Sequence, residues 1–161
     1  MPLVLLRIDD RLIHGQVVEG WLDAVGANLI IIASDEIAED EFQQTLLTLA
    51  VPPRIRAVFL KVNDVIGFFN TKQQAGDRIL LLVDNPNAAL QLIESGVKIS
   101  SINVGGMHYG EGKKQILPFL SVDADDRKSF EKINQMNVML EGRVLPGDTP
   151  IDIIDLLHRV F

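Results

Sequence analysis

The stretch Asn28-Leu-Ile-Ile-Ile-Ala33 is continuously apolar after its first residue, and Ile79-Leu-Leu-Leu-Val83 repeats the pattern further along the chain. A strand with one face in water alternates apolar and polar residues, whereas a continuous apolar run is typical of a strand covered on both faces. Three further runs have this character: Leu3 to Ile8, Ala57 to Val62 and Ile102 to Val104. Together these runs predict the buried, parallel strands of one sheet.

Two later runs are weaker. The first is Phe119 to Val122, and the second is Val138 to Val144, which alternates better and contains Gly142. Glycine weakens the interior of a strand because it has no side chain to pack. The second run is therefore expected at an edge of the sheet.

Amphipathic segments with helix signals separate these runs. Phe42, Leu46 and Leu49 follow helical spacing, and Phe42, like Trp21, is expected in the core. Asn63 is expected to cap a helix that begins Asp-Val-Ile, and Pro86 stands where a first helical residue should be.

The last two helices have signals of their own. Asp123 precedes an apolar pattern that includes Phe130 and Ile133, so it is expected to be a helix cap. The sequence Thr149-Pro150-Ile151-Asp152 resembles a capping box with proline at the first helical position. It predicts that the C-terminal helix begins at Pro150.

Alternation of strands and helices over 161 residues predicts an α/β fold, with residues 1–161 forming one domain. The expected architecture is a doubly wound, mostly parallel sheet with helices on both faces. Ligands of such sheets bind beyond the carboxyl ends of the strands. The loops that follow the strands are therefore the places to look for a site.

Composition excludes several classes of function. The formal net charge is −7 and no basic run is present, which disfavours nucleic acid or an anionic membrane as a partner. The chain has no cysteine, so disulfides, thiolate metal sites and thiol nucleophiles are excluded. Neither a signal peptide nor a membrane-spanning run is visible. We expect a cytoplasmic protein.

The loop after the first strand has the strongest chemical signal. It reads Arg7-Ile-Asp-Asp-Arg-Leu-Ile-His-Gly15, and a helix is expected to begin just after it. Arginine binds phosphate oxygens well, a helix N-terminus favours anions, and Gly15 lets a ligand approach the backbone. Histidine is the nearby side chain that can act as a nucleophile near neutral pH. The loop thus predicts a phosphate site with His14 as nucleophile.

A purely structural interpretation of the same loop is also open. Arg7 and Arg11 could pair with Asp9 and Asp10 on the surface, where such pairs contribute about 0–1 kcal/mol. Either aspartate could orient the imidazole of His14 and fix its tautomer, or could cap the following turn. Between these two roles, capping is the one we favour.

A second glycine-rich loop follows the strand at Ile102 to Val104. It contains Gly105, Gly106 and His108 and runs to Gly112. The two glycines could form a wall of the phosphate pocket, or the loop could be a flexible turn. His108 is expected at the rim rather than as a nucleophile.

The motifs resemble one known family. Arg-Ile-Asp-Asp-Arg-Leu-Ile-His-Gly-Gln-Val, residues 7–17, is similar to the active-site loop of the enzyme IIB component of the mannose/fructose/sorbose branch of the bacterial sugar phosphotransferase system (PTS). Asn103-Val-Gly-Gly-Met107 resembles a second segment of that family, and Arg143-Val-Leu-Pro146 with Thr149-Pro150 is a looser third match. Overall similarity leans toward the N-acetylgalactosamine members.

The resemblance implies a chemistry. His14 would accept a phosphoryl group from a phosphohistidine of the IIA component and pass it to a sugar held by the membrane components IIC and IID. Arg11 would contact the phosphate and Arg7 would assist, with Asp9, Asp10, Gly15, Gly105 and Gly106 in support. The implied protein is a phosphotransferase without cofactor or metal, and it can associate peripherally with the membrane transporter.

Two other functions remain as alternatives. A receiver domain also has an acidic pair after its first strand, but it needs a lysine after the fifth, where this chain has Gly105-Gly-Met-His108. A histidine phosphatase would need an arginine next to the histidine, and Arg11 is three residues away from His14. Sugar identity, oligomeric state and the phosphorylated nitrogen stay open at this stage.

Overall fold

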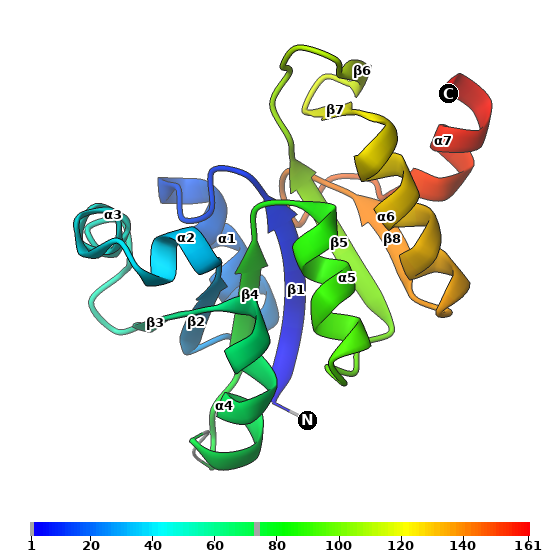
Figure 1. The fold of residues 1–161 in the computed structure, drawn as a ribbon. Helices are drawn as coiled ribbons and strands as arrows, with labels where there is room; N and C mark the ends of the chain where they lie inside the picture. The colour runs from blue at the N-terminus through cyan, green and yellow to red at the C-terminus, as the bar shows by residue number, and fades with distance from the viewer. Residues whose placement is uncertain (1, 73–74) are drawn as a thin grey trace.

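The computed structural model describes residues 2–72 and 75–161, and a twisted sheet runs through its middle (Figure 1). Its strands lie in the order β3-β2-β4-β1-β5-β8-β9. All pairs are parallel except that of β8 with β9. The strand bounds are β1 Leu3–Asp9, β2 Leu29–Ala33, β3 Arg56–Leu60, β4 Ile79–Val83, β5 Ser101–Gly106, β8 Met139–Gly142 and β9 Ile151–Asp152.

Helices cover both faces of this sheet, which confirms the doubly wound α/β architecture predicted from the sequence. Helices α1 and α3 pack on one face, and α4 to α7 pack on the other. The helix bounds are α1 Gly15–Val25, α2 Asp35–Ala38, α3 Glu41–Thr48, η1 Val62–Asp64, α4 Val65–Thr71, α5 Pro86–Glu94, α6 Ala124–Gln135 and α7 Ile153–Val160. In the described residues, no helix is both long and apolar enough to cross a bilayer.

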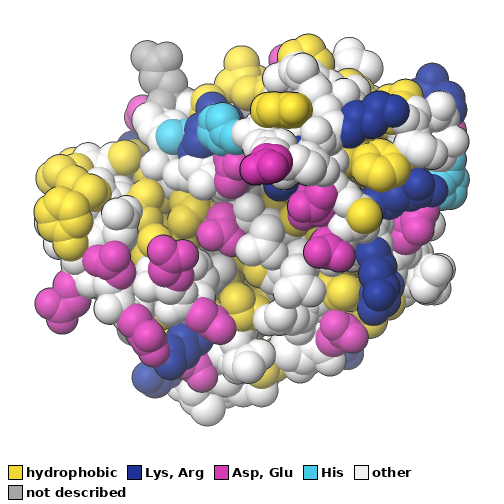
Figure 2. All heavy atoms as spheres, turned by 45° about the horizontal axis from the view of Figure 1, so that its top comes forward, with side chains coloured by type: hydrophobic (Ala, Val, Ile, Leu, Met, Phe, Trp, Pro, Cys, Tyr) yellow, Lys and Arg dark blue, Asp and Glu magenta, His cyan; other side chains and the backbone are white. Residues whose placement is uncertain are grey.

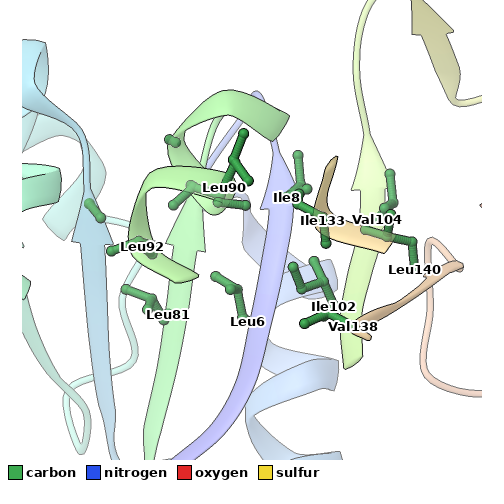
Figure 3. Close-up of a cluster of buried hydrophobic side chains, with 14 of the residues drawn as sticks. Leu6, Ile8, Leu81, Leu90, Leu92, Ile102, Val104, Ile133, Val138 and Leu140 are labelled. Carbon is green, nitrogen blue, oxygen red and sulfur yellow. The ribbon is translucent and has the colours of Figure 1, made fainter. Parts of the chain in front are cut away.

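The continuous apolar runs serve two cores at once. Successive strand residues point to opposite faces, so Leu29 and Ile31 enter the cluster under α4 to α7, whereas Ile30 and Ile32 enter the cluster under α1 and α3. Figure 3 shows the first cluster, where Leu6 and Ile8 of β1 meet side chains from β5, α5 and α6. Burial on both faces is why these strands lack polar alternation.

A short antiparallel hairpin lies apart from the main sheet. It consists of β6 (Lys114–Leu117) and β7 (Leu120–Val122), so the run Phe119 to Val122 does contain a strand, but not one of the main sheet. Backbone bonds join Met107 to both Phe119 and Ser121. The hairpin is thereby held over the loop that follows β5.

The C-terminal edge differs from the sequence prediction. The run Val138 to Val144 forms β8, but β8 is not at the edge because β9 pairs beyond it. Helix α7 begins at Ile153, and its N-cap is Asp152, whose side chain accepts from the backbone N–H of Asp155. The predicted start at Pro150 is therefore wrong, since Ile151 is used for strand pairing before the helix begins.

Two other local predictions are also wrong. Asn63 lies inside the short 3-10 turn η1, and α4 starts after it with Asp64 at the N-cap. Phe42 is 70% exposed although its spacing is helical, because the opposite side of α3, with Leu47, faces the core. Trp21, by contrast, is buried as predicted.

The position of the last cap can be tested by mutation. Asp152→Ala should lower the free energy of unfolding by about 1 kcal/mol, the usual loss for an N-cap carboxylate. Thr149→Ala should leave it unchanged, because α7 does not begin there. Urea unfolding of both variants measures the difference. A larger loss for Thr149→Ala would contradict the observed cap.

Candidate functional site

The loop between β1 and α1 turns back sharply over the carboxyl end of β1. Leu12 and Gly15 both have left-handed backbone conformations, with φ of +58° and +49°. Glycine adopts this conformation without strain, whereas for leucine it costs about 1–2 kcal/mol. The buried side chain of Leu12 packs in the core beneath α1, which holds the strained turn in place.

Asp9 is the hub of the loop. Its side chain is fully buried, and three positively charged or ionisable side chains meet it. Its Oδ2 accepts from Arg7 at 2.9 Å and from Arg11 Nη2 at 3.2 Å, and it lies 3.0 Å from His14 Nε2. Its Oδ1 accepts from Arg11 Nε at 3.2 Å and from the backbone N–H of Arg11 at 3.1 Å. The carboxylate therefore fixes the loop and the imidazole together.

Arg7 lies below the site and is fully buried. Besides Asp9, it donates to the side chain of Asn103 on β5 and to the backbone carbonyl of Arg143. Its guanidinium also lies 5.3 Å above the ring centre of Trp21 on α1. Burial lowers the pKa of Arg7, and the charge of Asp9 opposes that shift. With these partners Arg7 supports Asp9 and does not reach a ligand at the surface.

The network continues across the neighbouring strands β5 and β8. Asn103 donates to Glu141 on β8 at 3.0 Å, and Glu141 accepts two bonds from Arg143, at 2.8 and 2.9 Å. The guanidinium of Arg143 also lies over the ring of Trp21, 5.0 Å from the ring centre. The sequence indicated no role for Asn103 or Glu141, and it placed Trp21 in the core without a part in the site. The only available signal was that Asn103 and Arg143 belong to the second and third motifs.

The two motif glycines have different surroundings. A side chain at Gly105 would place its Cβ only 2.0 Å from Arg7 Cζ, so the space beside Gly105 is occupied by Arg7 and not by a ligand. Gly106 lies next to Arg11 and Asp9, and it lines a cavity. Of the two glycines predicted to form a wall of the pocket, only Gly106 lines the cavity, because the side chain of Arg7 fills the space beside Gly105.

His14 is the N-cap residue of α1. Its Nε2 faces Asp9, while its Nδ1 is covered and has no hydrogen-bond partner among the described residues. Burial lowers the pKa of His14 below 6.5, the charges of Arg11 and Arg7 lower it further, and Asp9 opposes them. The imidazole is thus held largely neutral near pH 7, which is the form that can act as a nucleophile.

A cavity of about 380 Å³ adjoins this loop. It is lined by Arg11, Gly106, Met107, His108, Tyr109, Gln115, Pro118, Phe119, Ser121 and Val144. Arg11 is 39% exposed, so it can keep its bonds to Asp9 and still present N–H groups to a ligand. Figure 2, with the carboxyl edge of the sheet turned forward, shows histidine, basic and acidic side chains side by side on this surface. In residues 2–72 and 75–161, no group of carboxylates and histidines could hold a metal ion.

Asp10 joins the two loops of the site. Its carboxylate accepts from the backbone N–H of His108 at 2.7 Å and lies 2.7 Å from His108 Nδ1. The backbone N–H of Asp10 donates to Gly106 at 3.1 Å. His108 is therefore exposed at the rim of the cavity, where the sequence placed it.

The structure also distinguishes the two aspartates. Asp9 accepts from the backbone N–H of Arg11, which is the capping role that we favoured. Its carboxylate also holds the imidazole of His14, so the orienting role is present as well. The carboxylate of Asp10 instead accepts from the backbone N–H of His108 and lies beside its imidazole. The alternative of surface ion pairs is wrong, because Arg7 and Asp9 are fully buried.

The packing of Arg7 against β5 predicts a large effect of a small substitution. Gly105→Ala should lower the free energy of unfolding by about 1–3 kcal/mol or more, because Arg7 has no room to move. Gly110→Ala is the matched control, since a Cβ there meets nothing within 4 Å, and it should stay within about 0.5 kcal/mol. Equal midpoints in urea unfolding would contradict the close packing of Arg7.

The lowered pKa of His14 predicts a pH dependence. Titration followed by NMR of the imidazole Cε1–H should have its midpoint below 6.5. Because the unfolded chain binds this proton more readily, stability should fall as pH decreases from about 6.5 toward the folded-state pKa. His14→Gln should remove that component of the pH profile. A midpoint at or above 6.5 would contradict the predicted direction.

Comparisons with known proteins bear on this site. The sequence profile of the PTS system sorbose subfamily IIB component matches residues 3–160. The chain is 41% identical over 160 residues to the mannose-specific EIIAB component of Escherichia coli K12, covering 99% of this chain and 50% of that protein. It thus spans about half the length of the first curated relatives that it matches. It is also 39% identical to the fructose-specific EIIB component of Bacillus subtilis, covering 99% of this chain and 98% of that protein.

Similarity does not single out the N-acetylgalactosamine branch. The N-acetylgalactosamine-specific enzyme IIB component 2 of E. coli is 41% identical, as is the mannose-specific relative, and the match covers 98% of this chain and all of that one.

Solved structures agree with the fold. The IIBSor domain of the sorbose permease of Klebsiella pneumoniae has a TM-score of 0.95 at 34% identity, covering 100% of this chain and 99% of that one. The N-acetylgalactosamine-specific IIB component 1 of E. coli has a TM-score of 0.89 at 34% identity, covering 94% and 99%. These matches favour the phosphotransferase interpretation over a receiver domain or a histidine phosphatase. The chain belongs to the sorbose subfamily of IIB components of the sugar phosphotransferase system.

Proposed function

We propose that residues 1–161 act as a phosphoryl relay in sugar transport, with His14 as the residue that accepts the phosphoryl group. The observation that carries the proposal is the environment of His14. Its imidazole is held neutral near the partly exposed Arg11, and Asp9, which also binds Arg11, fixes its ring through Nε2. Family membership supports the proposal, because relatives are named for the transport of mannose, fructose, sorbose or N-acetylgalactosamine.

The relay consists of two transfers. A nitrogen of His14 attacks the phosphorus of a phosphohistidine on the IIA component, a new N–P bond forms, and the old N–P bond breaks. A sugar hydroxyl then attacks the same phosphorus, its proton is released, and His14 regains its electron pair. The sugar would be held by the membrane components IIC and IID. Phosphoryl transfer mainly needs positioning and charge stabilisation, which this loop provides without a metal.

The geometry favours Nδ1 as the acceptor nitrogen. Nε2 is engaged with Asp9, and a neutral imidazole that donates from Nε2 keeps its free electron pair on Nδ1. Nδ1 is covered in this structure, so the loop has to open before a donor reaches it. The left-handed conformation of Gly15, next to His14, allows such a change at little cost.

Arg11 and the N-terminus of α1 would stabilise the incoming group. A phosphoryl group carries close to two negative charges, and Arg11 can supply charged N–H groups from the cavity side. Helix α1 begins at Gly15, so its free backbone N–H groups and its dipole point to the same place. Arg7, Asp10, Gly105 and Gly106 support the loop from below and from β5.

The proposal places the protein in the cytoplasm, where it would meet IIA in solution and the transporter at the membrane surface. We propose no nucleic-acid partner, given the net charge of −7. The described residues that line the cavity beside the His14 loop offer Arg11 to a phosphate, but they include no carboxylate to hold sugar hydroxyls, and their aromatic rings are those of Tyr109 and Phe119. The sugar would therefore bind only in the membrane complex.

A labelling experiment tests the relay directly. Purified protein incubated with phosphorylated IIA should gain one acid-labile, base-stable phosphoryl group, measured by mass spectrometry. His14→Ala should abolish labelling, whereas His108→Ala and His158→Ala should retain it. Sugar phosphate should form only after membranes with IIC and IID are added. Labelling of His14→Ala, or rapid sugar phosphorylation by the soluble proteins alone, would overturn the proposal.

Substitution of Arg11 tests the role of its planar group. Lysine keeps the charge but cannot bond both oxygens of Asp9 while facing the phosphate. A charge-assisted hydrogen bond contributes about 1.5–3 kcal/mol, so Arg11→Lys should slow transfer by about ten- to a hundredfold with the fold intact. Arg54→Lys, in an exposed pair with Asp23, is the control. Wild-type rates in Arg11→Lys would show that only charge matters.

A further inference from the structure

An apolar surface on α3 has no role in the site described above. Phe42 is 70% exposed, Leu46 is 46% exposed and Leu49, just after the helix, is 79% exposed. Their spacing places them on one side of the helix, while Leu47 and Ala50 pack against the core. We call these three exposed side chains the α3 surface. Helix α3 lies at the left of Figure 1, and hydrophobic side chains gather on the same side in Figure 2.

A groove runs beside this surface. It has a volume of about 450 Å³ and is lined by Glu41, Gln44, Thr45, Thr48, Leu49 and Phe59. Phe59 belongs to β3, the edge strand of the main sheet. A contiguous apolar surface next to a groove is typical of a protein interaction site.

Charges next to the α3 surface indicate what can bind there. Residues 35–41 contain five carboxylates and no lysine or arginine, whereas residues 42–53 contain no charged side chain. One of the five, Glu39, pairs with Lys61, while Glu36 and Glu41 are exposed. An occupant that buries Phe42 and Leu49 therefore also meets an acidic border. Electrostatic complementarity requires basic side chains on that occupant.

Two other occupants fit less well. An anionic bilayer would be repelled by the acidic border and by the net charge of −7. A second copy in a symmetric pair would bring its own residues 35–41 to the same interface, where like charges oppose association. By contrast, the cytoplasmic loops of membrane proteins are enriched in lysine and arginine.

We propose that the α3 surface docks the basic cytoplasmic face of the membrane component that receives the phosphoryl group. This inference rests on the proposed relay function. Helices α2 and α3 follow the carboxyl end of β2, and the His14 loop follows the carboxyl end of β1 in the same parallel sheet. Both therefore lie at one edge of the sheet, and the single view of Figure 2 shows the histidines together with the hydrophobic side chains on the α3 side. A partner on α3 would thus hold His14 toward the membrane.

Vesicle binding tests the docking surface. Inside-out vesicles with the membrane components, and matched vesicles without them, are mixed with protein already phosphorylated by IIA. Phe42→Ser with Leu49→Ser should weaken sedimentation with the first vesicles by at least about tenfold. It should also raise the KM for sugar phosphorylation with kcat kept. Met136→Ser with Met139→Ser, exposed on another part of the surface, is the control and should behave as wild type.

A charge variant gives an independent measurement. Glu36→Lys with Glu41→Lys should weaken binding, and it should reduce the dependence of binding on salt. Thermal unfolding checks that all variants fold. Phosphorylation of His14 by IIA in the same samples separates the two proposals. If the wild-type protein is not labelled, the relay proposal fails. If the protein is labelled but the Phe42/Leu49 variant binds vesicles as well as wild type does, only the docking surface is overturned.

Two further results would overturn the choice of partner. Equal binding of wild type to vesicles without the components would assign the surface to lipid. A wild-type dimer in sedimentation equilibrium that the Phe42/Leu49 variant dissociates would assign it to a second copy.

Discussion

The buried ion pair between Arg7 and Asp9 is the interaction on which the site depends. Both side chains are fully buried, and their atoms approach to 2.9 Å. Removing two charges from water costs several kcal/mol each, and their attraction offsets this only if the remaining polar atoms find partners. Asp9 finds them in Arg11 and His14, and Arg7 Nη1 finds them in Asn103 and the carbonyl of Arg143, whereas Arg7 Nε has no hydrogen-bond partner among the described residues. The site is therefore anchored from inside the fold.

The central position of β1 makes this arrangement possible. β1 lies between β4 and β5, so its last residues are surrounded by neighbouring strands before the chain turns into the loop. β5 contributes the space above Gly105 in which Arg7 lies, and β8 contributes Glu141 to hold Asn103. The loop can then be strained at Leu12 and still be fixed, because packing and the carboxylate of Asp9 both hold it.

The carboxyl edge of the sheet combines regions of different chemistry. Arg11 and the start of α1 provide positive charge around a neutral imidazole. The cavity under the β6–β7 hairpin opens on one side of the His14 loop. The acidic residues 35–41 and the α3 surface lie toward the other side of that loop. The relay that we propose would meet two partners in succession at one histidine. Distinct surfaces flanking that histidine are a physical means of recognising both.

The sequence by itself determined the class of fold and the members of the loop. Continuous apolar runs are a local consequence of burial on both faces, and Arg7, Asp9, Arg11 and His14 are neighbours along the chain. Tertiary structure decided how these residues are used: Arg7 turns inward because Gly105 leaves room, and Asp9 rather than Asp10 meets the imidazole. It also decided that Phe42 is exposed and that β9 precedes α7. The reason is that periodicity reports which residues can be buried, whereas the direction of a side chain depends on the space and charges supplied by distant strands.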